Sequence, residues 1–264
     1  MQHILTVCRS LSGWFLATSL ILSDGAAWAA EIHVMTSGGF TAAYNVLVPE
    51  FERTTGHKVI TAYGASMGNA PDAIPSRLAR KERVDIVILA APALEDLVRQ
   101  GQVAAGSRVD LVRSFVGMSV RAGANKPDIS TVDALKRTLL DAKSIAYSAS
   151  ASGVYISTEL FQQLGIADQV AGKARRILSE RVGAVVARGE AELGFQQVSE
   201  LLPVPGVDFV GPLPAEVQRV TVFSAGIATG AQEPDAAKAL IQFFTTAAAA
   251  PVINRTGLEP ITQP

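Results

Sequence analysis

Cysteine and histidine are nearly absent from this chain of 264 residues, which contains one Cys and three His. The cysteine, Cys8, lies close to the N-terminus, so the rest of the chain has no disulfide, no thiolate metal ligand and no cysteine nucleophile. Beyond the N-terminal segment only His33 and His57 remain, and neither has partners at the spacing of a zinc site. We therefore expect no metal and no organic cofactor.

Charge is also scarce. The chain has 23 Lys+Arg and 24 Asp+Glu, a net charge of -1, and 18% charged residues in all, whereas about 25% is usual for soluble domains. No basic run is longer than the pair Arg80 and Lys81. A nucleic-acid partner is excluded by this pattern, because it would require clustered Lys and Arg. With 48% hydrophobic residues, the chain is not a disordered one either.

The N-terminal segment has the pattern of a secretory signal peptide. Arg9 precedes an apolar stretch at about 14–22, and Ala27, Trp28 and Ala29 follow with the small-x-small pattern of a cleavage site. The alternative, a membrane anchor, needs about 20 apolar residues, and this stretch is roughly half as long. We predict that residues 1–29 are removed on export to a bacterial-type periplasm, and that Cys8 is removed with them.

Short apolar runs alternate with stretches of helical spacing along the rest of the chain. This alternation predicts an α/β fold in which mostly parallel sheets carry helices on both faces. Because the series occurs twice, we expect two lobes: residues 30–113 plus 222–264, and residues 114–221. The expected strands are 31–35, 58–63, 84–89, 114–120, 144–147, 191–195 and 217–227. The expected helices are 40–55, 72–81, 93–100, 154–164, 181–188 and 234–246.

Loops rich in Ser and Gly follow three of the expected strands, at 36–39, 64–68 and 148–153. In open α/β sheets, ligands bind where strands end and helices begin. A helix N-terminus presents free backbone N–H groups and a partial positive charge, and small residues let an anion approach them. Each loop taken alone is better explained as an ordinary helix cap. Three such loops, divided between two lobes, favour a shared anion-binding cleft.

Several of these segments resemble the molybdate-binding type of periplasmic solute-binding protein. The resemblance rests on 37–39, 51–56, 63–68, 85–88 and 181–194 and covers nearly all of the chain after residue 29. It implies the two-lobed type II periplasmic-binding-protein fold and a monomer. It also implies that an oxyanion is held by Ser37 and Ser66 and by backbone groups near Ser152, Gly153 and Val182.

One position departs from that pattern. The family has a tyrosine after the strand that corresponds to 193–195, where this chain has Gln196 and Gln197. This difference argues against molybdate itself.

Five sequence motifs are similar to a subgroup of the superfamily that includes a periplasmic aconitate isomerase. They are Ser-Gly-Gly-Phe at 37–40, Gly-Ala-Ser-Met-Gly at 64–68, the segment 73–80, Ser-Ala-Ser-Gly-Val-Tyr at 150–155 and the segment 194–203. The resemblance implies a cofactor-independent enzyme that moves a proton between allylic carbons of cis- and trans-aconitate. The alternative is a receptor that delivers a small anion, either a carboxylate or a molybdate-like oxyanion, to an ABC-type importer in the membrane.

A tricarboxylate needs both cations and neutral donors, and Arg77 and Arg181 are the candidate cations. Either arginine is equally explained as an exposed helix charge. Tyr155 and Glu180 are the candidate catalytic groups, with Asp72 as a third, and the pattern does not choose among them. The expected substrate-binding residues are Ser37, Gly38, Gly39, Ser66, Met67, Arg77, Ser150, Ser152, Gly153, Arg181, Val182 and Gln197.

Overall fold

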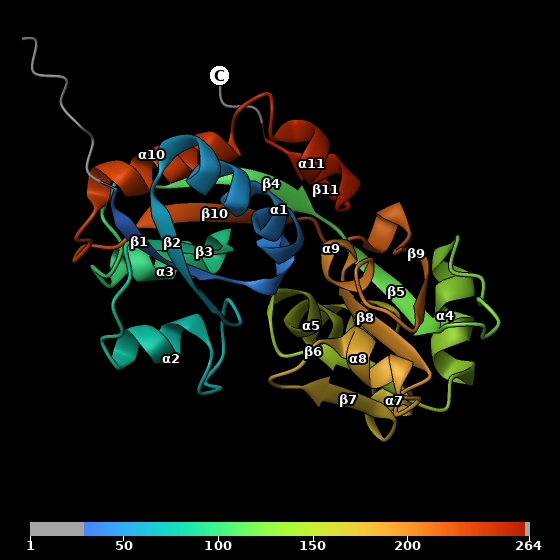
Figure 1. Ribbon diagram of the computed structural model, residues 1–264. Helices are drawn as coiled ribbons and strands as arrows, with labels where there is room; N and C mark the ends of the chain where they lie inside the picture. The colour runs from blue at the N-terminus through green and yellow to red at the C-terminus, as the bar shows by residue number, and fades with distance from the viewer. Residues whose placement is uncertain (1–28, 262–264) are drawn as a thin grey trace, which may run out of the picture.

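The computed structural model describes residues 29–261, and Figure 1 shows them arranged as two lobes, each built on its own sheet. The segment before residue 29, with Cys8 and nearly all of the predicted signal peptide, lies outside the described residues. No helix within 29–261 combines the length and the apolar character needed to cross a membrane. The α/β two-lobed architecture predicted from the sequence is confirmed.

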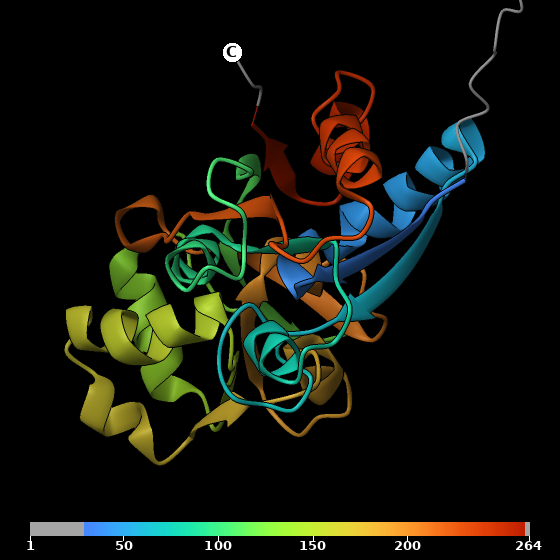
Figure 2. The same ribbon diagram turned by 90° about the vertical axis from the view of Figure 1, so that its left-hand side faces the viewer.

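The first lobe contains a six-stranded sheet in the order β11-β4-β10-β3-β1-β2. Its strands are β1 (Glu31–Thr36), β2 (Lys58–Tyr63), β3 (Ile86–Ala90), β4 (Val109–Ser114), β10 (Thr221–Ile227) and β11 (Leu258–Pro260). Its helices are α1 (Gly38–Thr55), α2 (Ile74–Ala79), α3 (Ala91–Arg99), α10 (Pro234–Phe244) and α11 (Ala250–Arg255). Figure 2 shows the C-terminal helices beside the N-terminal strand and helix, so both ends of the described chain lie in this lobe.

Helix α1 packs on one face of this sheet together with α10. Its buried side chains recur at helical spacing, as at Phe40, Tyr44 and Leu47, and the ring of Phe40 lies 5.3 Å from that of Phe244 on α10. Gly56 ends the helix with a φ of 76°, a left-handed conformation that glycine adopts without strain. Leu94 and Leu97 of α3 pack in a separate cluster on the opposite face, so the lobe has three layers.

The second lobe contains a five-stranded sheet in the order β7-β6-β8-β5-β9. Its strands are β5 (Val116–Arg121), β6 (Ile145–Ser148), β7 (Ala174–Ile177), β8 (Leu193–Gln197) and β9 (Val207–Pro212). Its helices are α4 (Val132–Asp141), α5 (Ala151–Tyr155), α6 (Phe161–Gln163), α7 (Ala167–Ala171), α8 (Val182–Ala187) and α9 (Val198–Leu201). A π-helical turn, Ile156–Leu160, joins α5 to α6. Side chains of α4 to α7 form the core on one face, and those of α8 form a smaller core with β6.

Both sheets are mixed rather than mostly parallel, which corrects the expectation from the sequence. β1 pairs in parallel with β2 and β3, and β6 pairs in parallel with β7 and β8. The strands nearest the connections between lobes, namely β4, β5, β9 and β10, pair antiparallel. The physical reason lies in the path of the chain. It leaves the first lobe along β4 and returns along β10, and it enters the second lobe along β5 and leaves along β9. The two strands of each pair therefore run in opposite directions, whereas a parallel pair would need a crossover connection.

The chain passes between the lobes twice, from β4 to β5 through Phe115 and from β9 back to β10. The Gln218 amide ties the two passages together: its Oε1 accepts the Val116 N–H at 2.8 Å, and its Nε2 donates to the Val116 carbonyl at 3.0 Å. Helix α9 of the second lobe contacts α1 of the first, where Ser199 Oγ donates to the Gly39 carbonyl at 2.7 Å. The exact lobe boundaries given above stay a prediction.

Candidate functional site

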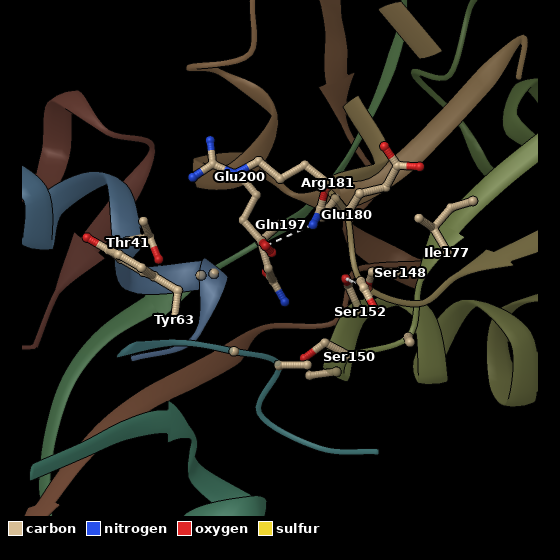
Figure 3. Close-up of a pocket in the computed structure, with 18 of the residues that line it drawn as sticks. Thr41, Tyr63, Ser148, Ser150, Ser152, Ile177, Glu180, Arg181, Gln197 and Glu200 are labelled. Atoms are coloured by element: carbon tan, nitrogen blue, oxygen red, sulfur yellow. Dashed lines mark hydrogen bonds between the residues drawn. The ribbon is translucent and has the colours of Figure 1, made fainter. Parts of the chain in front are cut away.

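A cavity of about 360 Å³ lies between the lobes. All three predicted Ser/Gly-rich loops contribute to its wall, as do the start of α8 and the end of β8, and Figure 3 shows side chains from both lobes facing it. The residues expected from the sequence that line it are Gly38, Gly39, Asp72, Ser150, Ser152, Glu180, Arg181 and Gln197. The expected residues outside its lining are Ser37, Ser66, Met67, Arg77, Gly153, Tyr155 and Val182.

The first lobe contributes the N-terminus of α1, which begins at Gly38. The first backbone N–H groups of a helix have no partner within the helix, so this end of an 18-residue helix attracts negative charge. Ser37 immediately precedes the helix, and its hydroxyl is buried without a hydrogen-bond partner. A buried hydroxyl without a partner is costly, so a ligand or water that bonds to it would be stabilised here.

The second lobe contributes the loop that leads into α5. Ser150 is the residue before the helix, and the hydroxyls of Ser148 and Ser152 lie 3.1 Å apart within hydrogen-bond reach. Gly153 lies behind this loop rather than in the cavity, because a Cβ there would come within 1.6 Å of the Ser148 carbonyl oxygen. Glycine at this position therefore lets the helix lie directly against the end of β6.

The second Ser/Gly-rich loop is held mainly from within its own lobe. Ser66 is fully buried, and its Oγ accepts the Ala90 N–H at 3.0 Å. Arg77 on α2 donates from Nε to the Asp72 carbonyl at 3.1 Å and from Nη1 to Glu82 Oε2 at 2.7 Å. In this arrangement Arg77 braces the loop, and its charge is paired with Glu82 instead of facing the cavity.

Arg181 supplies positive charge at the opposite wall. Among the described residues that line the cavity, it alone is a lysine or arginine, and none of the ion pairs found within 29–261 includes it. It is the residue before α8, whose first N–H, that of Val182, donates to Gln196 Oε1 at 3.0 Å. The guanidinium is thus available to a carboxylate.

The two catalytic candidates from the sequence both have partners already. The hydroxyl of Tyr155 donates to the Val217 carbonyl at 2.6 Å, and the Arg219 guanidinium lies 4.6 Å from the ring centre. Burial raises the pKa of Tyr155. Glu180 is at the rim, where both its oxygens accept from Arg188, at 2.9 and 3.1 Å, and its side chain points away from Glu200 in Figure 3.

Glu200 is a cavity residue that the sequence reasoning missed. Its Oε1 accepts a hydrogen bond of 2.8 Å from Gln196 Nε2. A Cβ added to Gly38 would lie 1.9 Å from the same oxygen, so the carboxyl group reaches across to the start of α1. Burial raises the pKa of Glu200 to about 7, against the opposing effects of Arg181, Gln196 and the Gln197 N–H.

The local sequence signal at Glu200 indicates a helix cap. It stands three residues after Gln197, the residue before α9, and an acidic residue there is typical of a helix N-terminus. Only the packing of α9 against α1 shows that this side chain reaches the cavity and the start of α1.

The model of one protein family, described as bacterial extracellular solute-binding protein, matches residues 32–259. The chain belongs to this family. An aconitate isomerase from a Pseudomonas species is 50% identical over 228 residues, which are 86% of this chain and 87% of that protein. The molybdate-binding protein ModA of Azotobacter vinelandii is 28% identical and aligns over 94% of this chain and 97% of its own length. The predicted relationship to the solute-binding superfamily and to its aconitate isomerase subgroup is confirmed.

Solved structures agree with this fold. The periplasmic molybdate-binding protein of Azotobacter vinelandii has a TM-score of 0.69 at 22% identity and covers 88% of this chain and 100% of its own. The sulfate-binding protein SubI of Mycobacterium tuberculosis has a TM-score of 0.69 at 20% identity, with 88% and 87% covered. Within residues 29–261, no group of three or more His, Cys, Asp or Glu is placed to hold a metal ion.

Proposed function

We propose that this protein is an isomerase that interconverts cis- and trans-aconitate in the cavity between its lobes, without a cofactor. The observation that carries the proposal is the 50% identity to an aconitate isomerase over 86% of this chain. Fold likeness alone would not distinguish catalysis from binding.

The polarity of the cavity suits a substrate with three carboxylates. One carboxylate would lie at the N-terminus of α1, near Gly38, Gly39 and the unpartnered Ser37 hydroxyl. A second would pair with Arg181, which has no ion-pair partner among the described residues. The Ser150 and Ser152 loop would supply neutral donors to the third. Gln197 would complete the wall. Ser66, Met67, Arg77, Gly153 and Val182 would support the lining residues from behind it.

The reaction needs a base, positive charge near the developing enolate, and exclusion of water. The base removes a proton from the methylene carbon of aconitate, and the electron pair of the broken C–H bond forms a new C=C bond to the central carbon. The original C=C pair then takes up a proton at the other end of the allylic system. No electrons leave the substrate, so the proposed reaction requires no redox partner.

We propose the periplasm as the location, after removal of residues 1–29. The family is extracellular, which agrees with export. The second candidate function is a receptor that delivers a small anion to a membrane importer. It is favoured by membership of the solute-binding family and by the alignment with ModA.

The two candidate functions differ in whether bound cis-aconitate is converted. Purified protein incubated with cis-aconitate should produce trans-aconitate, and the reverse reaction should reach the same ratio of isomers. Proton NMR of the vinyl and methylene signals would follow both directions, with heat-denatured protein as the blank. Turnover should continue after exhaustive chelation. Saturable binding of cis-aconitate without any conversion would establish a receptor instead.

A further inference from the structure

Glu200 is an acidic side chain of the second lobe that reaches the first lobe inside the cavity. It projects from α9 of the second lobe, and its Oε1 lies so close to the start of α1 that a side chain on Gly38 would overlap it. We propose that the Glu200 carboxylate is the group that carries the proton between the two allylic carbons of the substrate. This inference rests on the proposed isomerase function and assigns its catalytic residue.

The orientation of the carboxylate is fixed by its neighbour Gln196. The backbone N–H of Val182 can only donate, so the Gln196 atom 3.0 Å from it must be the amide oxygen. The amide nitrogen therefore faces Glu200 and donates to its Oε1 at 2.8 Å. The backbone N–H of Gln197 is a second hydrogen-bond donor to the carboxyl group. Gln196 thus acts as a positioning residue for Glu200.

The other ionisable groups around the cavity are less suited to this role. Glu180 is held in a two-point pair with Arg188 at the rim, and the Tyr155 hydroxyl is bonded to the Val217 carbonyl. Asp72 lines the cavity from the first lobe and is the competing carboxylate. The charged group that acts on Glu200 is Arg181, which favours its ionised form.

One carboxylate is sufficient for both proton transfers. Glu200 accepts the proton from the methylene carbon as its C–H bond breaks, and the resulting acid returns that proton to the other allylic carbon as the double bond moves. The atoms balance and no co-reactant is needed. The pKa of about 7 that burial produces makes both the base and the acid accessible near neutral pH. The negative charge of the intermediate would be stabilised by Arg181 and by the N-terminus of α1.

The decisive variant is Glu200→Gln, which keeps the shape and the bond from Gln196 but cannot accept a proton. We expect turnover of cis-aconitate to fall by about 10²- to 10⁴-fold. Calorimetry should show cis-aconitate bound as tightly as by the wild type or more tightly, because one negative charge is removed. Asp72→Asn tests the competing carboxylate and should lower turnover far less than Glu200→Gln does. Asp96→Asn, in an exposed ion pair with Arg99, is the matched control and should leave turnover unchanged. A thermal melt of each variant would verify that it folds.

The pH profile tests the assignment independently. Because the base must be ionised, wild-type turnover should decrease as the pH falls below about 7. Gln196→Met removes a hydrogen bond that lowers the pKa of Glu200, so the acidic limb of the profile should move to higher pH. A purely structural role for Gln196 would lower turnover without moving that limb.

The role of Glu200 and the isomerase function can fail separately in these experiments. If the wild type converts cis-aconitate and Glu200→Gln does so equally well, Glu200 is not the base although the isomerase function stands. If Asp72→Asn is the inactive variant, Asp72 is the base instead. If the wild type binds cis-aconitate without converting it, the isomerase function is overturned, and the inference with it.

Discussion

Gly38 begins α1 at the point where Glu200 approaches from the other lobe. A methyl group there would lie 1.9 Å from Glu200 Oε1 and 2.7 Å from its Cδ. The obstacle is the end of a flexible side chain, so the helix can accept a Cβ if the carboxyl group moves away. The lack of a side chain at Gly38 therefore matters more for the position of the Glu200 carboxyl group than for the formation of α1.

Gly38→Ala should consequently lower the activity of the protein without lowering its stability. Alanine favours helix by about 0.5–1 kcal/mol over glycine, so the melting temperature should not fall. Turnover of cis-aconitate should drop by about a hundredfold, as expected for a displaced catalytic group. Steady-state kinetics and thermal melts would measure both effects. Gly172→Ala, where a Cβ meets nothing within 4 Å, is the control and should leave turnover unchanged. Full activity in Gly38→Ala would show that the observed carboxyl position is not required.

At the scale of elements, the regular parts of the chain were predictable. The expected strand at 58–63 has the same bounds as β2, and the helix expected at 40–55 is α1 with two more residues at its start. Apolar periodicity was sufficient for α1 because this helix buries one face. β-branched and aromatic residues were sufficient for β2, an edge strand without a buried face. Strands β7 and β9 were not predicted. β7 has two exposed arginines in four residues, and β9 is a half-buried edge strand ending in Gly-Pro. Edge strands need little apolar patterning.

The candidate site, like the fold, was predictable only in part. The Ser/Gly-rich loops and Arg181 were found because helix N-termini leave a local signature. Glu200 was not found, because its significance depends on the packing of α9 against α1. The Ser199–Gly39 hydrogen bond between these helices joins residues 160 positions apart in the chain. A contact between residues so far apart cannot be predicted from the pattern of neighbouring residues.

Asp85 joins three segments of the first lobe. Its fully buried carboxylate accepts backbone N–H groups from His33 at 2.8 Å, Gln232 at 2.6 Å and Glu233 at 3.1 Å. One of these donors is on β1, and the other two immediately precede α10. The carboxylate therefore fixes the start of α10 against the sheet.

Asp85→Ala should lower the free energy of unfolding by at least about 2 kcal/mol, because three backbone N–H groups lose their buried, charged acceptor. Urea denaturation monitored by circular dichroism would measure the loss. Asp96→Ala is the matched control: Asp96 pairs with Arg99 at the surface, where both side chains are more than half exposed, so its removal should cost at most about 0.5 kcal/mol. Equal losses in the two variants would contradict the role assigned to Asp85.

For the whole molecule, the cavity wall is divided between lobes that are joined by two passages of the chain and by the α1–α9 contact. A ligand that bridges the lobes should stabilise the protein as a unit. At a concentration of one hundred times the dissociation constant, binding contributes about 2.7 kcal/mol to the free energy of unfolding. A tenfold weaker affinity removes about 1.4 kcal/mol, or half of that stabilisation.

The two arginines should differ in how much they contribute to this ligand-dependent stabilisation. Arg181→Ala should weaken cis-aconitate binding at least tenfold, because the substrate carboxylate loses the only lysine or arginine among the described residues that line the cavity. It should therefore halve the ligand-induced shift in melting temperature. Arg77→Ala removes a contact to Glu82 and to the Asp72 carbonyl, so it should lower the melting temperature without ligand and leave the shift nearly intact. Scanning calorimetry with and without cis-aconitate would measure both. A shift lost in Arg77→Ala but kept in Arg181→Ala would place the carboxylate contact on α2 instead, because only a direct contact changes affinity more than stability.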